Sequence, residues 1–280
     1  MKKFWGITIS LLLGLTLAGC GSQAATSHSA SGKSSTSVKS TTSSAKKSRT
    51  KAASSSQSAS STSSKTSSSS SQAPQPVADR LTALRSQLKA ALPTALLPTA
   101  YPLPAGQVLN ASYSGNATNY TIYFAARNSA LPLNTSNVNA NAADIALSAQ
   151  TYPTASAAEA QINYQAPETG LPTVALGDHL TGTQQGAAGS TYLTWQEGRW
   201  SLTTQAINQN QENPVPLSRQ VVALLSEAFL PVPATHGAIA LRVNTGGLRL
   251  NSVTWRQGKV WYQATGVDAM TLLRVVTSLK

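Results

Sequence analysis

Two related stretches organise this sequence: Thr194-Trp195-Gln196-Glu197-Gly198-Arg199 and, 60 residues later, Thr254-Trp255-Arg256-Gln257-Gly258-Lys259. In each copy the glycine predicts a tight turn between two strands, and an amphipathic helix follows. The sequence therefore predicts a duplicated ββα unit, near residues 190–230 and 251–280. One such unit cannot bury its apolar face alone, so we expect the two copies to share one sheet.

The residues before this repeat add further helices and strands to the prediction. Leucines at helical spacing follow Pro76 and predict a helix over 77–92. Ser156 followed by Glu159 is typical of a capping box, which predicts a short helix to residue 164. Alternating apolar residues predict three strands, at 107–113, 118–127 and 145–152. Together these elements predict an α+β domain over residues 77–280, with a mostly antiparallel sheet covered by helices.

A segment rich in serine and threonine precedes this domain. Residues 22–71 contain 31 Ser or Thr in 50 positions and no aromatic residue. Such a composition cannot bury enough apolar surface to offset the entropy of ordering the chain, so we expect residues 20–76 to be a disordered tether. The segment carries 7 of the 21 basic residues and no acid. No aromatic side chains are interleaved with these cations, so the net charge of +12 does not indicate nucleic-acid binding.

Residues 1–19 have the pattern of a secretory signal peptide. Lys2 and Lys3 precede an apolar stretch that is shorter than the ~20 residues of a membrane-spanning helix. This N-terminus is similar to that of bacterial lipoproteins, in which small residues precede an invariant cysteine. The resemblance implies that Cys20, the only cysteine, carries diacylglycerol and a fatty acid such as palmitate and anchors the chain to the cell membrane. The matching signal-peptidase motif is Leu17-Ala18-Gly19-Cys20.

The domain itself carries a second resemblance. The segments 170–172 and 189–193, together with the signal peptide and the tether, resemble surface lipoproteins of lactic-acid bacteria, which have no assigned activity. One further motif resembles a C-terminal module of Gram-positive lipoproteins and membrane-anchored regulators: Trp255-x-x-Gly258-x-x-Tyr262-x-x-x-Gly266-x-Asp268. These motifs are features of hairpins and of a core, so they imply a fold and a cellular location more than a function.

Aromatic residues on the two predicted hairpins are the candidates for ligand contact. They fit two interpretations, namely packing across strands in the core or a platform that stacks on sugar rings or peptides. Trp200 and Trp261 differ by one position relative to their turns, so at least one of them is a candidate for exposure. We therefore take Trp200, Trp261 and Tyr262 as candidate ligand contacts.

The sequence displays no complete catalytic or metal-binding motif. His179 and His236 lack the His-x-x-x-His spacing and an acidic cluster, so we expect neither a zinc nor a calcium site, and no cofactor. Asp178 and His179 suggest part of a serine hydrolase, but no Gly-x-Ser-x-Gly elbow accompanies them. We therefore predict no catalytic residues.

The sequence thus predicts a non-catalytic lipoprotein on the extracytoplasmic face of the membrane, which binds or scaffolds at the cell envelope. Its expected partners are the membrane, through Cys20, and a cell-wall polymer or another envelope protein. Two alternatives stay open: an envelope hydrolase or an accessory to one, and an extracytoplasmic sensory or regulatory module. Clustering of Asp178 and His179 with a serine would favour the hydrolase, and an exposed tryptophan groove would favour binding.

Overall fold

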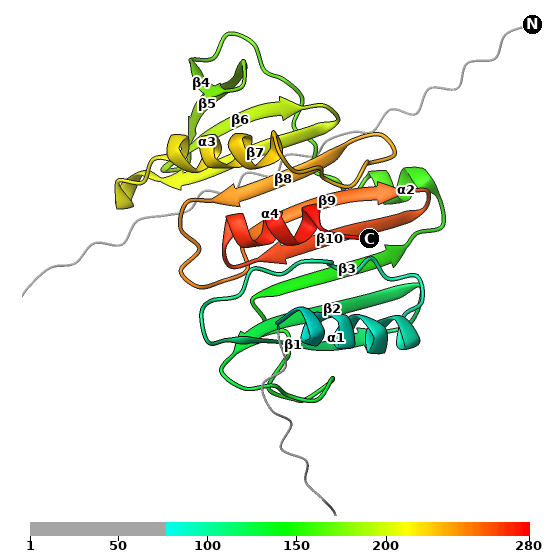
Figure 1. The fold of residues 1–280 in the computed structure, drawn as a ribbon. Helices are drawn as coiled ribbons and strands as arrows, with labels where there is room; N and C mark the ends of the chain where they lie inside the picture. Colours follow the sequence, from blue (N-terminus) through cyan, green and yellow to red (C-terminus); the bar gives the residue numbers. More distant parts are fainter. Residues whose placement is uncertain (1–76) are drawn as a thin grey trace, which may run out of the picture. The chain divides into compact units, whose positions relative to one another are not determined.

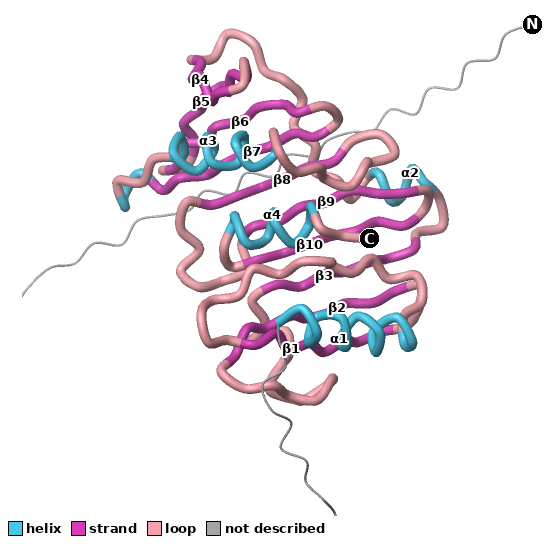
Figure 2. Tube along the Cα trace, in the orientation of Figure 1, coloured by secondary structure: helices cyan, strands magenta, loops and turns pink. Residues whose placement is uncertain are grey.

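The computed structural model describes residues 77–280 (Figures 1 and 2). The predicted signal peptide, the lipidation motif with Cys20 and the predicted tether lie outside the described residues. None of the helices within residues 77–280 has the length and the apolar character that a membrane crossing requires.

The described part consists of ten strands in a single sheet, four α-helices and one 3-10 turn. The helices are α1 (Val77–Ala91), α2 (Ala155–Glu159), α3 (Pro214–Leu225) and α4 (Ala269–Thr277), and the turn is η1 (Asn208–Asn210). The strands are β1 (Val108–Gly115), β2 (Asn119–Arg127), β3 (Ile145–Thr151), β4 (Thr173–Gly177), β5 (Leu180–Ala187), β6 (Ser190–Glu197), β7 (Trp200–Ile207), β8 (Gly237–Arg242), β9 (Asn251–Gln257) and β10 (Val260–Gly266).

Three meanders build this sheet. The strands β1–β2–β3, β4–β5–β6–β7 and β8–β9–β10 pair in chain order within each meander, and the third meander lies between the other two. The resulting order is β1-β2-β3-β10-β9-β8-β7-β6-β5-β4. Only β7 and β8 are parallel among the described strands, because the chain crosses over through α3 between them.

The predicted α+β fold class, with a sheet covered by helices, is wrong. The described part is dominated by one large, mostly antiparallel sheet and has few helices. The hairpins β6–β7 and β9–β10, each followed by a helix, supply only four of its ten strands. The helices α1, α3 and α4 lie on the same face of the sheet and leave the opposite face without them (Figure 1).

Individual elements before the repeat agree better with the sequence. The predicted helix from residue 77 and the three predicted strands are confirmed as α1, β1, β2 and β3. The predicted capping box at Ser156 is wrong, because the N-cap of α2 is Thr154. Its side chain accepts a hydrogen bond from the N–H of Ala157, at 3.1 Å. The helix then ends at Glu159 rather than at residue 164.

The two repeated glycines form equivalent turns. Gly198 and Gly258 both have a φ of 58°, in the left-handed region that glycine adopts without steric cost. Trp200 and Val260 each begin the strand after the turn. Trp261 is therefore one residue further along than Trp200, and it points to the opposite face of the sheet.

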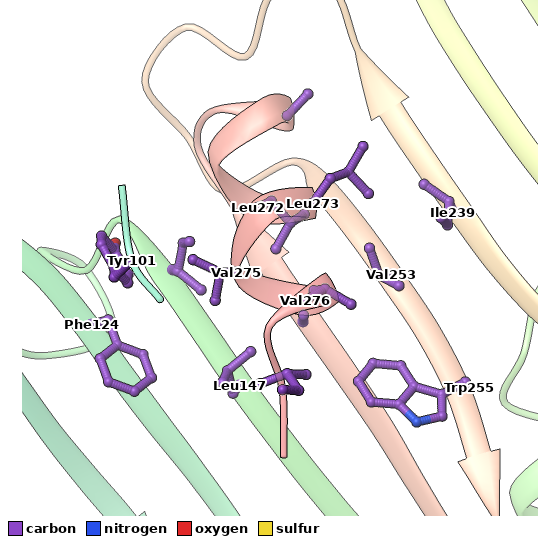
Figure 3. Close-up of a cluster of buried hydrophobic side chains, with 14 of the residues drawn as sticks. Tyr101, Phe124, Leu147, Ile239, Val253, Trp255, Leu272, Leu273, Val275 and Val276 are labelled. Atoms are coloured by element: carbon purple, nitrogen blue, oxygen red, sulfur yellow. The ribbon is translucent and has the colours of Figure 1, made fainter. Parts of the chain in front are cut away.

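The hydrophobic core lies between the sheet and the three helices. Figure 3 shows the part of this core that lies beneath α4. Trp255 is the largest of its fully buried side chains, with 1% of its surface exposed. The ring centroid of Trp255 lies 6.3 Å from that of Trp200 and 5.2 Å from that of Tyr262, on which it stacks. The helix α4 covers β9 and β10 with its buried residues Ala269, Leu272, Leu273, Val275 and Val276.

Candidate functional site

A connecting segment crosses the face of the sheet that the helices leave free. This crossing segment, residues 160–172, leads from α2 to β4 at the edge of the sheet. The hydroxyl of Tyr164 donates to Oε1 of Gln196 at 3.1 Å, and the N–H of Gln165 donates to Oγ of Ser201 at 3.0 Å. Gln196 and Ser201 alternate along β6 and β7 with residues buried under the helices, so the segment lies on the opposite face.

An ion pair and an aromatic contact hold the start of the crossing segment. Glu159, the last residue of α2, accepts a hydrogen bond from Nε of Arg256 on β9. Its Oε1 also lies 3.9 Å from Nδ1 of His236. The ring of Tyr164 packs on His236, with centroids 4.3 Å apart. The segment is thus fixed to the start of β8 and to β9.

A groove of about 480 Å³ lies between the crossing segment and the sheet. Seven of its lining residues carry hydroxyl groups on the sheet floor: Thr183, Tyr192, Thr194, Ser201, Thr203, Ser252 and Thr254. Six carry amide groups, from the floor and from the crossing segment: Gln161, Asn163, Gln165, Gln185, Gln205 and Gln263. Among the lining residues of the described part, only Glu168 and Arg242 are charged. The groove is therefore close to neutral, and its hydroxyl and amide groups lie beside apolar lining residues such as Leu171, Ile239 and Leu250.

The register of the sheet arranges these side chains in rows across the strands. One row consists of direct partners on β5, β6, β7 and β8: Thr183, Thr194, Thr203 and Ala240. The next row consists of Gln185, Tyr192, Gln205 and Arg242 on the same strands. The hydroxyls of Thr194 and Thr203 are 3.1 Å apart, and Nε2 of Gln205 donates to the hydroxyl of Tyr192 at 3.1 Å. These contacts fix the orientation of the polar groups before any ligand binds.

Two alanines are among the residues that β8 contributes to the floor. Ala238 and Ala240 line the groove, whereas the flanking strands present longer threonine, serine and glutamine side chains. Ala240 is exposed although β8 lies inside the sheet. Small side chains flanked by longer ones make a depression in the floor at these two alanines.

The lining residues define what this groove can do chemically. Hydroxyl groups donate and accept hydrogen bonds, and amide side chains do both through separate atoms. A concave site with several convergent polar groups is the usual form of a ligand-binding site. The groove therefore offers many directed hydrogen bonds and little net charge.

The aromatic residues that the sequence suggested for ligand contact lie elsewhere. Trp200 is 5% exposed and packs in the core, so the structure does not support direct ligand contact for this residue. Tyr262 is partly buried on the core face, where it stacks on Trp255. Trp261 is partly exposed on the opposite face, but it does not line the groove. A role for Trp261 and Tyr262 in ligand contact stays a prediction.

The histidines and acids weighed for catalysis or metal binding lie apart from the groove lining. Asp178 and His179 have φ angles of 46° and 62° and form the two-residue turn between β4 and β5. Within residues 77–280, no three His, Cys, Asp or Glu side chains are grouped so that they could hold a metal ion.

A second hollow, of about 430 Å³ and more apolar than the groove, lies at the turn between β6 and β7. Its lining includes Glu197, Arg199 and the exposed Phe229. Burial raises the pKa of Glu197, a hydrogen bond from Nε1 of Trp195 opposes this effect, and Asp178 raises the pKa further.

Glu197→Gln is expected to reduce the pH dependence of stability. Because the folded state raises the pKa of Glu197, it binds this proton more tightly than the unfolded state. Stability is therefore lost as the pH rises from the unfolded pKa of about 4.3 through the folded pKa. Glutamine stays neutral, so the advantage of the variant over the wild type should grow with pH. Urea unfolding between about pH 4 and 7 measures this difference.

The matched control is Glu227→Gln, which removes a carboxylate from an exposed position. The pH-dependent gain of Glu197→Gln should exceed that of this control. A gain that is constant across the pH range would contradict the prediction.

Comparison of the chain with protein-family models, with curated proteins and with solved structures found no match.

Proposed function

We propose that the domain is a non-catalytic binding module that holds a polar ligand in the groove beneath the crossing segment. The observation that carries this proposal is the groove itself, about 480 Å³ in volume and lined by thirteen hydroxyl- or amide-bearing side chains from strands of one sheet and from the crossing segment. Polar groups on adjacent paired strands are held in place by the backbone ladder, so they are preorganised for a ligand.

The proposal includes a place at the cell envelope. The motif that ends in Cys20, after a short apolar stretch, supports lipidation and display on the extracytoplasmic face of the membrane. The Ser/Thr-rich residues 20–76 then lie between the anchor and the groove. This arrangement would present the groove to a wall polymer or to another envelope component.

Ala240→Trp is expected to weaken binding strongly without unfolding the domain. The side chain at position 240 is exposed on the floor of the groove, so an indole there fills the space that a ligand would occupy. The affinity of the full chain for isolated bacterial cell walls should fall by more than about tenfold, which corresponds to about 1.4 kcal/mol. Sedimentation with increasing amounts of wall material measures this affinity.

The matched control is Ala187→Trp, which adds the same indole to an exposed strand position on β5 outside the groove lining. This control should bind like the wild type. Equal binding by Ala240→Trp and Ala187→Trp would overturn the proposal, as would the absence of saturable wild-type binding to any envelope fraction.

A further inference from the structure

We infer that the ligand of the groove is an uncharged, hydroxyl-rich glycan chain. This inference rests on the proposed binding function and adds the chemical class of the ligand. Three properties of the groove carry it: its near absence of charge, its dual hydrogen-bonding character and the pairing of its floor strands.

Charge is the first property. Anionic polymers are held by clusters of Lys and Arg, and cationic ligands are held by carboxylates. Residues 77–280 contain 12 basic and 9 acidic residues, yet Arg242 and Glu168 are the only charged residues that line the groove in this part of the chain. A highly charged ligand would lose its hydration in this site without gaining ion pairs in return.

Hydrogen bonding is the second property. Each hydroxyl of a sugar both donates and accepts, and it leaves an unsatisfied group if only one of these needs is met. The threonine, serine, glutamine and asparagine side chains of the groove supply both functions at closely spaced positions. The ring of Tyr192, in the row of Gln185 and Gln205, also gives the site an aromatic group against which a sugar ring can stack.

Strand pairing is the third property, and it argues against an extended peptide. Peptides often bind by adding a strand to a free sheet edge, with apolar pockets for alternate side chains. The strands β5 to β10, which form the floor, each have a paired neighbour on both sides. The ladder therefore occupies main-chain groups of these strands, and the floor of the groove binds through its side chains.

Thr203→Val tests the inference because valine keeps the shape of threonine and removes only the hydroxyl. Thr203 lies in the middle of its row in the groove. Loss of one hydrogen bond should weaken binding about five- to tenfold. The probe is the uncharged oligosaccharide fraction released from isolated cell walls by mild acid hydrolysis and separated by anion exchange. Calorimetry with the full chain measures the affinity for this probe.

The matched control is Thr121→Val on β2. Thr121 lies on the same face of the sheet, and its hydroxyl is paired with that of Ser148 at 2.9 Å, much as Thr203 is paired with Thr194. Thr121 does not line the groove, so this control should leave the affinity unchanged. If Thr203→Val and Thr121→Val bind the probe with equal affinity, the hydroxyl of Thr203 does not contribute to binding. That result would overturn the inference.

Salt dependence and competition separate this inference from the proposed function. Binding of an uncharged glycan should change less than about twofold between about 50 and 500 mM salt, because no exposed ion pairs are screened. The anionic fraction and a tryptic digest of wall proteins serve as competitors for wall binding. Suppose that wild-type wall binding is lost in Ala240→Trp, and that the anionic fraction or the tryptic digest competes for it while the uncharged fraction does not. The uncharged glycan is then refuted as the ligand, and the binding module stands. If the loss in Ala240→Trp is absent, both proposals fail.

Discussion

Trp255→Ala is expected to lower the free energy of unfolding by about 3–5 kcal/mol, the range for large aromatic residues in cores. Trp255 is 1% exposed, and it touches both the neighbouring repeat, through Trp200, and its own hairpin, through Tyr262. Its removal leaves a cavity that sheet strands, fixed by their hydrogen bonds, cannot close. Urea unfolding followed by circular dichroism measures the loss.

The matched control for this substitution is Trp261→Ala. It removes the same residue type from the neighbouring strand, at a partly exposed position on the opposite face of the sheet. Its cost should be clearly smaller, because less apolar surface returns to water. Equal costs for the two variants would contradict the prediction that the burial of Trp255 determines its contribution to stability.

Gly237→Ala is expected to cost about 1–3 kcal/mol through overpacking. A Cβ atom at position 237 would lie 2.4 Å from Cε3 and Cζ3 of Trp200, a rigid ring that is itself held against Trp255. The first residue of β8 must therefore lack a side chain so that β7 and β8 can pair. Thermal or urea unfolding detects the effect.

Gly186→Ala on β5 provides the control, because a Cβ atom there meets nothing within 4 Å. That variant should be close to neutral. Replacing Trp200 with leucine should relieve most of the penalty of Gly237→Ala, and a double-mutant cycle measures this coupling. If the two alanine variants cost the same, or if the cycle shows no coupling, the steric explanation is wrong.

Part of the fold was predictable from short-range patterns. Leucines at helical spacing identified α1, and alternating apolar residues identified β1 to β3, because these elements bury one regular face. The fold class was wrong because three further strands have weak patterns. β4, β5 and β8 are short or rich in threonine, glutamine and alanine, and β-propensity alone does not reveal such strands.

The groove was not predictable in the same way, because two distant parts of the chain form it. Polar residues do alternate along β7, where Ser201, Thr203 and Gln205 face away from the core. Any solvent-exposed sheet face shows this alternation, so the pattern does not distinguish a binding site. The groove exists only because residues 160–172 cross that face, which follows from the non-local order of the strands.

Tryptophan drew attention in the sequence because its chemistry suits both a core and a ligand platform. Register decides between these roles. Trp195, Trp200 and Trp255 face the helices, and the shift of one residue between the two hairpins places Trp261 on the other face. The polar rows beside them carry the candidate site instead.

The position of the third meander has a consequence for the time at which the domain can form. β10 pairs with β3 at the middle of the sheet, and the main chain of Lys280 exchanges two hydrogen bonds with Leu97, both at 3.1 Å. The edge of β7 stays open until β8, which ends at Arg242, has been synthesised, and the edge of β3 stays open until β10, which ends at Gly266, has been synthesised. Open edges of this kind can pair with other chains. Long-range pairing of this kind also slows folding. A chain that emerges from the ribosome or from a translocation channel therefore needs protection against aggregation until β10 has emerged.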